Sequence, residues 1–101
     1  SPLQAIYSVS KAGLIMLTKV MASELGRQGV RVNCICPGLI KTQLSEALWS
    51  NPELEKAVTD QKALGRIGTV DELAGAAIYL ASDASSFTTG AVLQVDGGMV
   101  I

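Results

Sequence analysis

A tyrosine and a lysine near the start of the chain are the first candidates for a catalytic role. Tyr7 and Lys11 are four positions apart, and two residues at that spacing on a helix share a face. An ammonium group close to a phenol favours the phenolate, whereas burial of the pair would oppose that effect. A phenol adjusted in this way can give or take a proton near neutral pH, which is the task of a general acid or base. Most such pairs only decorate a helix surface, so the spacing alone is a weak signal.

A proline–glycine turn after an apolar run is the second feature that could serve a ligand. Residues 30–36 are rich in β-branched side chains and are followed by Pro37 and Gly38, which predicts a strand and then a turn. In open α/β sheets, ligands bind beyond the carboxyl ends of the strands. A glycine there lets backbone amides approach a ligand without obstruction by a side chain. The alternative is an ordinary turn that ends a strand.

A long N-terminal helix should hold the tyrosine and the lysine. Ser1-Pro2-Leu3-Gln4 has the pattern of a helix start, with a hydroxyl cap and a proline in the first turn. Apolar residues from Leu3 to about Arg27 wrap most of the helix circumference, which predicts burial on several sides. Gln28-Gly29 should end the helix.

The rest of the chain continues the alternation of helices and strands. A helical excursion is expected over residues 39–68, with a second helix start at Asn51-Pro52-Glu53. A capping box, Thr69-Val70-Asp71-Glu72, predicts a further helix that reaches about residue 82. A second strand is expected over residues 91–95.

Two strands joined by helices should be parallel, but they are too few for an independent sheet. Such a sheet usually needs three or more strands with a covered face. The predicted fold class is therefore α/β, with the chain as an incomplete part of a doubly wound parallel sheet. Completion of the sheet by another chain is the alternative.

The composition indicates a buried, globular chain and argues against several classes of function. Hydrophobic residues make up 49% of the 101 residues, and charged residues 17%. The formal charge is −1 and no basic stripe is present, so nucleic-acid binding is not expected. No apolar run approaches the roughly 20 residues of a membrane span. A cytoplasmic protein without membrane contact is therefore expected.

The two cysteines are expected to be reduced core residues. Cys34 and Cys36 lie two apart in the first strand, a spacing that holds their Cα atoms near the upper limit for a disulfide. The chain contains no histidine, and the cysteines lack the paired spacing of a zinc site. Metal catalysis is not expected.

Three segments together resemble the short-chain dehydrogenase/reductase family. The first is Tyr7-Ser8-Val9-Ser10-Lys11-Ala12-Gly13, which is similar to the family's active-site segment, and the second is the strand and Pro-Gly loop over residues 31–42. The third comprises residues 65–68 and 89–98, which resemble the family's closing helix and last strand. The resemblance covers essentially the whole chain, so residues 1–101 are expected to form the C-terminal, catalytic-side part of one Rossmann-type domain.

The resemblance implies an oxidoreductase that uses NAD or NADP and a small alcohol or carbonyl substrate. A hydride would pass between the nicotinamide and the substrate carbon, while the Tyr7 hydroxyl protonates the carbonyl oxygen. Lys11 would hold the nicotinamide ribose and tune Tyr7. The family's additional serine and its glycine-rich phosphate loop would both fall before Ser1, so this chain by itself is expected to be inactive.

The resemblance also implies cofactor contacts in the loop after the first strand. Ile40 would bond the nicotinamide carboxamide through its backbone, and the Thr42 hydroxyl would reach the carboxamide or the pyrophosphate. Pro37 and Gly38 would shape the loop.

Between Thr42 and Gly65 the family carries a variable lid over the substrate. Leu44, Leu48 and Trp49 would give that lid a largely apolar pocket, although Trp49 is equally expected to serve only as an anchor for the lid. The loop together with Leu48-Trp49 looks most similar to NADP(H)-dependent carbonyl and retinal reductases of the family.

Assembly and two rival functions complete the expectations. The corresponding helix of family members packs against a symmetry mate, so a homodimer or homotetramer is expected. One rival is a non-catalytic protein that kept the cofactor-binding fold. The other is a fragment with only a structural role.

Overall fold

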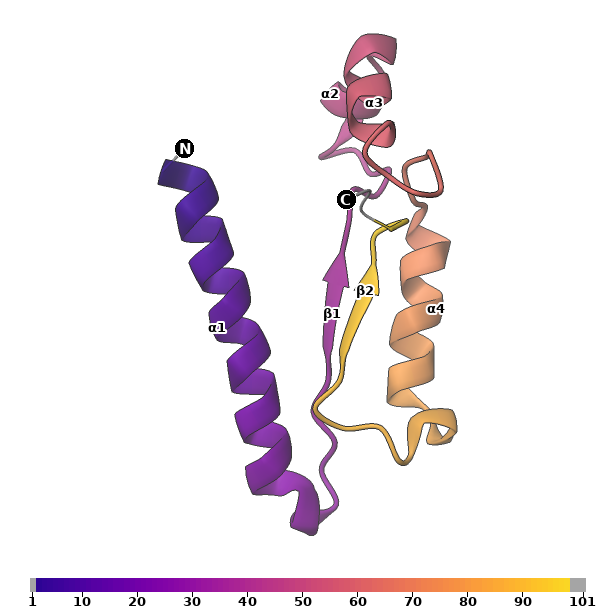
Figure 1. The fold of residues 1–101 in the computed structure, drawn as a ribbon. Coiled ribbons are helices and arrows are strands. Elements are labelled where there is room, and N and C mark those ends of the chain that lie inside the picture. Colours follow the sequence, from indigo (N-terminus) through magenta and orange to yellow (C-terminus); the bar gives the residue numbers. More distant parts are fainter. Residues whose placement is uncertain (1, 99–101) are drawn as a thin grey trace. The chain divides into compact units, whose positions relative to one another are not determined.

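The computed structural model describes residues 2–98, with side chains from residue 5 onward. Helices and strands alternate along this range, as expected for an α/β chain (Figure 1). In chain order the elements are α1 (Pro2–Leu25), the 3-10 helix η1 (Gly26–Gln28), β1 (Cys34–Pro37), α2 (Glu46–Trp49), α3 (Pro52–Thr59), α4 (Val70–Ala81), the 3-10 helix η2 (Asp83–Ser85) and β2 (Val92–Val95).

Strands β1 and β2 pair in a two-stranded parallel sheet, which confirms the predicted direction (Figure 1). The Cys34 amide donates to the Ala91 carbonyl at 2.9 Å, and the Gly38 amide donates to the Val95 carbonyl at 2.9 Å. The partner number rises with the residue number, which is the pattern of parallel strands.

The first strand begins later than residues 30–36 predicted, and this part of the prediction is wrong. The Val32 amide donates to the Thr89 hydroxyl, and the Val32 carbonyl accepts from the Gly90 amide at 2.7 Å. The amide and the carbonyl of Val32 therefore bond to a side chain and to a turn residue, and not to a neighbouring strand. β-Branched residues indicated an extended backbone here, but they could not show what it pairs with.

The chain divides into two units, of which the first comprises residues 2–34 and 80–93. Thr18 and Ala22 on α1 are buried in it. Arg31, in the segment before β1, binds the segment that precedes β2. Its guanidinium donates to the Ser85 hydroxyl at 2.8 Å and to the Ser82 and Thr88 carbonyls at 3.3 Å. Ser85 is almost completely buried.

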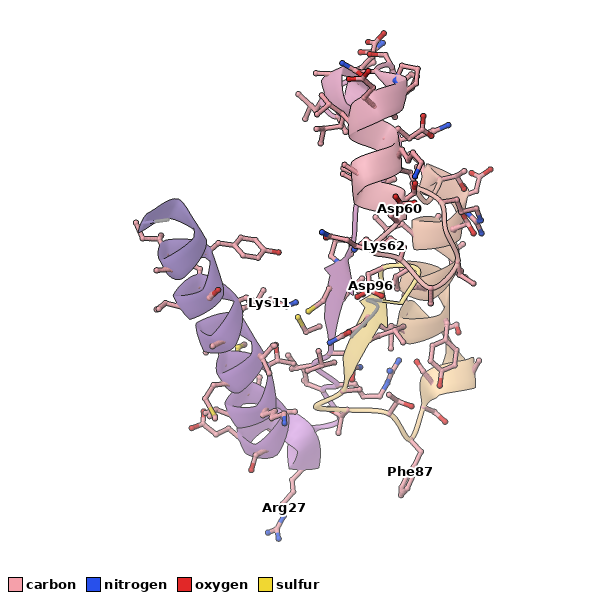
Figure 2. All side chains as sticks on the ribbon, turned by 45° about the horizontal axis from the view of Figure 1, so that its top comes forward. Lys11, Arg27, Asp60, Lys62, Phe87 and Asp96 are labelled. Carbon is pink, nitrogen blue, oxygen red and sulfur yellow. The ribbon has the colours of Figure 1, made fainter. Side chains whose placement is uncertain are left out.

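The continuous helical stretch of α1 and η1 ends where predicted, because Gly29, the C-cap of η1, takes a left-handed conformation with φ of 81°. The expected cap, Ser1, lies outside the described residues. Only Thr18 and Ala22 of this helix are buried by the described part of the chain, so burial on several sides is not achieved within it. Phe87, between η2 and β2, is also fully exposed (Figure 2). The exposed apolar side chains of α1 include Ile6, Val9, Leu14, Met16, Leu17, Val20 and Met21.

The expectation that no segment approaches a membrane span is wrong by length and composition. Residues Ala5–Gln28 form one continuous helical stretch of 24 residues, and 18 successive residues of it have a mean hydropathy of 1.2. The sequence pattern concealed this, because small and hydroxyl residues interrupt the apolar run without lowering its average much. Core helices of soluble proteins can have the same length and hydropathy, so this helix does not by itself indicate a membrane.

The second unit comprises residues 35–79 and 94–98 and confirms two predicted helix starts. Asn51 caps α3, since its side-chain oxygen accepts from the amides of Glu53 and Leu54. The capping box of α4 forms in both directions. The Thr69 amide donates to the Glu72 carboxylate at 3.0 Å, and the Glu72 amide donates to the Thr69 hydroxyl at 3.4 Å.

Cys34 and Cys36 are buried and are not joined in a disulfide, which confirms the prediction of reduced core residues. Within the second unit, Cys36 and Ile67 are the buried apolar side chains of the described residues.

Candidate functional site

Tyr7 and Lys11 lie on one face of α1, because the helix runs without a break through both positions. Tyr7 is 64% exposed and Lys11 is half-buried. The Lys11 side chain extends from the helix with its amine at the tip (Figure 2). No hydrogen bond or ion pair to another described residue occupies the phenol or the ammonium. Neither polar group is therefore occupied by another described residue, and the catalytic role of the pair stays a prediction.

Gly38 opens the loop after β1 and is held tightly against the end of β2. A Cβ atom at this position would lie 2.7 Å from the Asp96 Cα and 2.8 Å from the Asp96 Cβ. The Gly38 amide is already used, since it donates to the Val95 carbonyl. The close approach of Asp96 therefore requires glycine at this position, and the role of Pro37 and Gly38 in shaping a cofactor loop stays a prediction.

Ile40 forms a parallel bridge with Gly68, and this bridge determines where its amide points. The Gly68 amide donates to the Leu39 carbonyl at 3.1 Å, and the Lys41 amide donates to the Gly68 carbonyl at 2.9 Å. In a trans peptide the N–H and the C=O point in opposite directions. The Ile40 N–H therefore points away from Gly68, and no described residue accepts a hydrogen bond from it. No hydrogen bond to a described residue therefore occupies the atom for which a ligand contact was predicted, and that contact stays a prediction.

The hydroxyl and the carbonyl of Thr42 are both hydrogen-bonded within the second unit, which the sequence did not predict. Its hydroxyl donates to the Ser45 hydroxyl at 3.3 Å and accepts from the Ser45 amide at 3.3 Å. Its carbonyl accepts from the Trp49 indole N–H at 3.0 Å. A cofactor contact through the Thr42 hydroxyl stays a prediction, and such a contact would have to share or replace these bonds.

The proposed lid residues do not enclose a pocket within the second unit. Leu44 is fully exposed, and the Leu48 side chain is about one third exposed. Trp49 is more covered, and the Lys41 amine lies 5.5 Å from the centre of its ring. The contacts of the indole with Thr42 and Lys41 are consistent with the alternative role of Trp49, in which it anchors the lid. The substrate-pocket role of these three residues stays a prediction.

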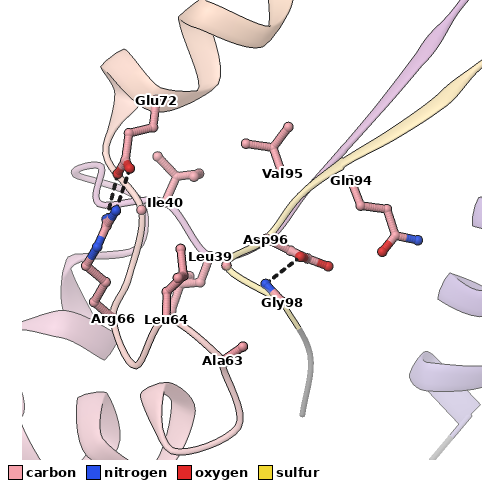
Figure 3. A pocket seen from close by; sticks show the side chains of 12 residues that line it. Leu39, Ile40, Ala63, Leu64, Arg66, Glu72, Gln94, Val95, Asp96 and Gly98 are labelled. Atoms are coloured by element: carbon pink, nitrogen blue, oxygen red, sulfur yellow. Dashed lines mark hydrogen bonds and ion pairs between the residues drawn. The ribbon is translucent and has the colours of Figure 1, made fainter. Parts of the chain in front are cut away.

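The second unit has a cavity of about 480 Å³ that the sequence did not predict (Figure 3). It lies between the loop after β1 and the chain after β2, and most of its wall is apolar. Its charged groups Arg66 and Glu72 are paired with each other, and the Asp96 carboxylate accepts from the Gly98 amide at 2.9 Å. The lining residues include Leu39, Ile40, Ala63, Leu64, Val95 and Gly97.

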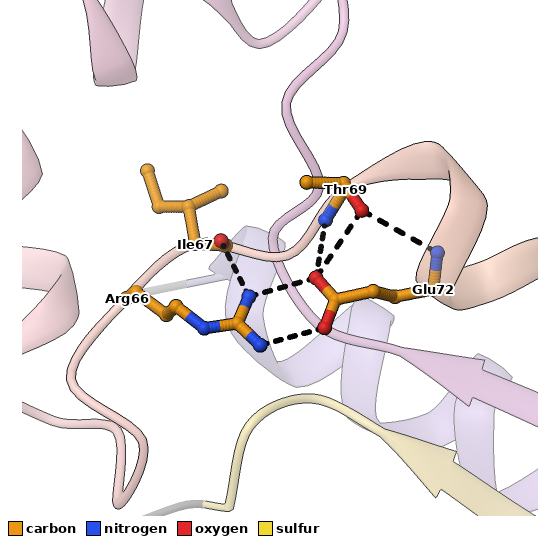
Figure 4. A network of polar contacts seen from close by, with 4 residues as sticks. All are labelled: Arg66, Ile67, Thr69 and Glu72. Carbon is orange, nitrogen blue, oxygen red and sulfur yellow. Dashed lines mark hydrogen bonds and ion pairs between the residues drawn. The ribbon is translucent and has the colours of Figure 1, made fainter.

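A salt bridge at the start of α4 supports the segment that bridges to Ile40 (Figure 4). The Arg66 guanidinium donates to both carboxylate oxygens of Glu72, at 2.7 and 2.6 Å. These bonds, with the Thr69 amide, lower the pKa of Glu72 to about 2, and the pairing raises the pKa of Arg66. These bonds tie Arg66, Thr69 and Glu72 together, and Gly68 lies within the segment that they span.

Sequence reasoning missed Ser45 and Gly68 as residues that shape the loop. Thr42 and Ser45 are three positions apart, a spacing at which a hydroxyl can bond to a nearby backbone amide. That local pattern could have indicated Ser45. Nothing in the spacing of Ile40 and Gly68 indicates their bridge, because it joins distant segments.

Comparison with known proteins provides independent evidence. The family model described as "Enoyl-(Acyl carrier protein) reductase" matches residues 1–100. A 3-oxoacyl-(acyl-carrier-protein) reductase FabG of Chlamydia trachomatis is 46% identical over 98% of this chain and 39% of its own length. An L-xylulose reductase of Bos taurus is 42% identical over 95% of this chain and 39% of its own length. The chain thus spans about two fifths of the curated relatives it matches.

Solved structures agree with the sequence matches. A 4-hydroxyisoleucine dehydrogenase complexed with NADH superposes with a TM-score of 0.88 and 41% identity, covering 93% of this chain and 39% of that one. A gluconate 5-dehydrogenase from Burkholderia cenocepacia, in complex with NADP and tartrate, gives a TM-score of 0.81 and 42% identity over 90% of this chain and 36% of that one. These are Rossmann-fold dehydrogenases, so the predicted fold class is confirmed.

Proposed function

Because the chain belongs to the short-chain dehydrogenase/reductase family, we propose that the full-length protein interconverts an alcohol and a carbonyl compound with NAD(H) or NADP(H). The observation that carries the proposal is the pair Tyr7 and Lys11, which α1 holds on one face with both polar groups unused by other described residues. This chain spans only part of its relatives, so the activity is proposed for the whole protein and not for residues 1–101 alone.

The loop after β1 fits the nicotinamide end of such a cofactor. The Ile40 N–H has a fixed direction and no acceptor among the described residues, so it can donate to the carboxamide oxygen. The Thr42 hydroxyl is a second donor if it leaves Ser45. When bound, the nicotinamide supplies or accepts the hydride. NADH and NADP are named with different solved relatives, which supports the cofactor class without selecting one of the two.

Tyr7 would move the proton of the reaction. In the reducing direction its hydroxyl donates a proton to the carbonyl oxygen while the hydride adds to the carbonyl carbon, and the product is an alcohol. Lys11 would donate hydrogen bonds to the ribose hydroxyls of the cofactor. Its positive charge would also stabilise the tyrosinate that remains after proton transfer.

The substrate is proposed only by chemical class. Relatives of similar identity are named for a 3-oxoacyl thioester and for L-xylulose, so the likeness favours small alcohols and carbonyl compounds in general. Membership of the carbonyl and retinal reductase subgroup, a lid pocket at Leu44, Leu48 and Trp49, a homodimer or homotetramer and a cytoplasmic location are parts of the same proposal.

The test compares the full-length protein with its Tyr7→Phe variant. Carbonyl-dependent oxidation of NADPH and NADH is followed with a panel of carbonyl substrates that includes a 3-oxoacyl thioester and a ketose. Loss of a general acid should lower kcat by about 10²–10⁴-fold, while the affinity for cofactor is retained. Tyr79→Phe, which changes the chain's other tyrosine, is the matched control and should keep its activity.

Equal activity in wild type and Tyr7→Phe would eliminate the mechanism. Cofactor binding by the wild type without turnover of any carbonyl compound would favour the non-catalytic rival. The isolated 101-residue chain should bind NADPH weakly or not at all, and submicromolar binding would show that the missing part of the domain is not needed.

A further inference from the structure

The Ser45 hydroxyl is bonded to the loop that precedes it and not to the helix that follows it. We infer that Ser45 is a positioning residue for the nicotinamide end of the cofactor, an inference that rests on the proposed function. Ser45 occupies the N-cap position of α2, yet its side chain makes no capping hydrogen bond to that helix. A serine at this position ordinarily uses its oxygen on the first free amides of the helix. Here the oxygen is committed elsewhere.

The hydroxyl joins two separate peptide groups of the loop. Ser45 Oγ lies 2.6 Å from the Ile40 carbonyl oxygen, which is the shortest of its contacts to an acceptor. A hydroxyl has a single proton, so this carbonyl receives it. The same oxygen accepts from the Thr42 amide at 3.0 Å. Ser45 therefore holds the peptide groups on both sides of Lys41.

Together with Gly68, Ser45 fixes both peptide groups that flank Ile40. The peptide between Leu39 and Ile40 is oriented by the Gly68 amide, which donates to the Leu39 carbonyl. The peptide between Ile40 and Lys41 is oriented on one side by the Gly68 carbonyl and on the other by Ser45. The Ile40 N–H is left as the one backbone donor of this pair of peptides without an acceptor among the described residues. Its direction is set before any ligand arrives.

A preset donor binds more tightly than a mobile one, because no conformational freedom is lost on binding. Removal of the Ser45 hydroxyl leaves the Ile40–Lys41 peptide held only by the Gly68 carbonyl, and it leaves the Thr42 amide without its acceptor. The loss should appear in binding of the nicotinamide end and not in binding of the adenosine end, which the loop at Ile40 is not proposed to contact.

The experiment uses the full-length protein and measures dissociation constants for two probes. The first probe is the nicotinamide cofactor that the wild type prefers, and the second is ADP-ribose, or its 2′-phosphate if NADP(H) is preferred, which lacks the nicotinamide. Ser45→Ala should weaken binding of the whole cofactor by about three- to tenfold, the size of one lost hydrogen bond. Binding of ADP-ribose should stay within about twofold of the wild type.

Two further variants separate positioning from folding. Ser45→Thr keeps the hydroxyl and should restore cofactor affinity. Ser50→Ala removes another serine at the far end of α2, whose hydroxyl makes no hydrogen bond to the described residues, and should bind both probes as the wild type does. In steady-state assays, Ser45→Ala should raise KM for the cofactor more than it lowers kcat.

An unchanged affinity for the whole cofactor in Ser45→Ala would overturn the inference. An equal loss for both probes would also overturn it, since that result indicates general damage to the domain. A wild type that binds neither probe would refute the proposed function itself, and the wild-type titration alone reveals that case.

Discussion

Substitution of Gly38 by alanine should destabilise the protein by an amount that the contact with β2 predicts. The added Cβ would lie 2.7 Å from Asp96 Cα, 2.8 Å from Asp96 Cβ and 3.2 Å from the Asp96 carbonyl oxygen. Two of these are backbone atoms, so no side-chain rotation relieves the contact. The ends of the two strands must separate, which also stretches the 2.9 Å bond from the Gly38 amide to Val95.

The expected cost is about 1–3 kcal/mol for overpacking, with about 1 kcal/mol more if the hydrogen bond is lost. At about 2–4 °C per kcal/mol for a domain of the size of its relatives, Gly38→Ala should lower Tm by several degrees. Thermal unfolding of the full-length protein, followed by circular dichroism, measures this shift.

Gly75→Ala is the matched control and has the opposite expected sign. Gly75 lies inside α4, and a Cβ there meets no described atom within 4 Å. Alanine in a helix interior is favoured over glycine by about 0.5–1 kcal/mol, so Tm should rise slightly or stay unchanged. If Gly38→Ala were as stable as wild type, the close approach of β1 and β2 at Asp96 would be refuted.

Two further predictions concern the polar networks. Glu72→Gln should reduce stability at neutral pH; because the pKa of Glu72 in the folded protein is lowered to about 2 from 4.5, the advantage of the wild type should be complete above pH 4.5 and disappear as the pH falls toward 2, which urea unfolding across this window would show. An advantage that persists unchanged at the acid end would contradict the role of the Arg66 pairing. Ser85→Ala removes a buried acceptor of Arg31 and should cost about 1–3 kcal/mol, whereas Ser86→Ala, at an exposed neighbour, should cost little in the same unfolding assay.

The helices were the most predictable part of the fold, because their signals are local. The Thr69–Glu72 capping box and the Asn51-Pro52 start both form the hydrogen bonds that their residue types predict. Gly29 ends η1, and with it the helical stretch that begins with α1, through a left-handed conformation that other residues rarely adopt. Each of these features depends on a few neighbouring residues, which a single sequence displays directly.

The strand boundary and the loop geometry could not be predicted in the same way. The start of β1 depends on its pairing with distant residues near Ala91, and the direction of the Ile40 amide depends on Gly68. The hydrophobic pattern predicts that a segment is extended, but it does not predict which residues that segment pairs with. Tyr7 and Lys11 were first indicated by their helical spacing and then supported by the resemblance to a family, whereas Ile40 came from that resemblance alone. The structure adds that the Ile40 amide has no acceptor among the described residues.

The pairing of β1 with β2 determines when this part of the sheet can form as the protein is synthesised. Cys34 and Ala91 are 57 positions apart in the chain, but their backbones are hydrogen-bonded in the fold. The first strand therefore leaves the ribosome well before its partner exists, and contacts between such distant segments form late. During that interval the thiols of Cys34 and Cys36, which are buried in the folded chain, should react with alkylating reagents, and they should become protected once later segments of the chain have packed around β1. Pulse labelling of these two cysteines on stalled nascent chains would therefore time the closure of the sheet.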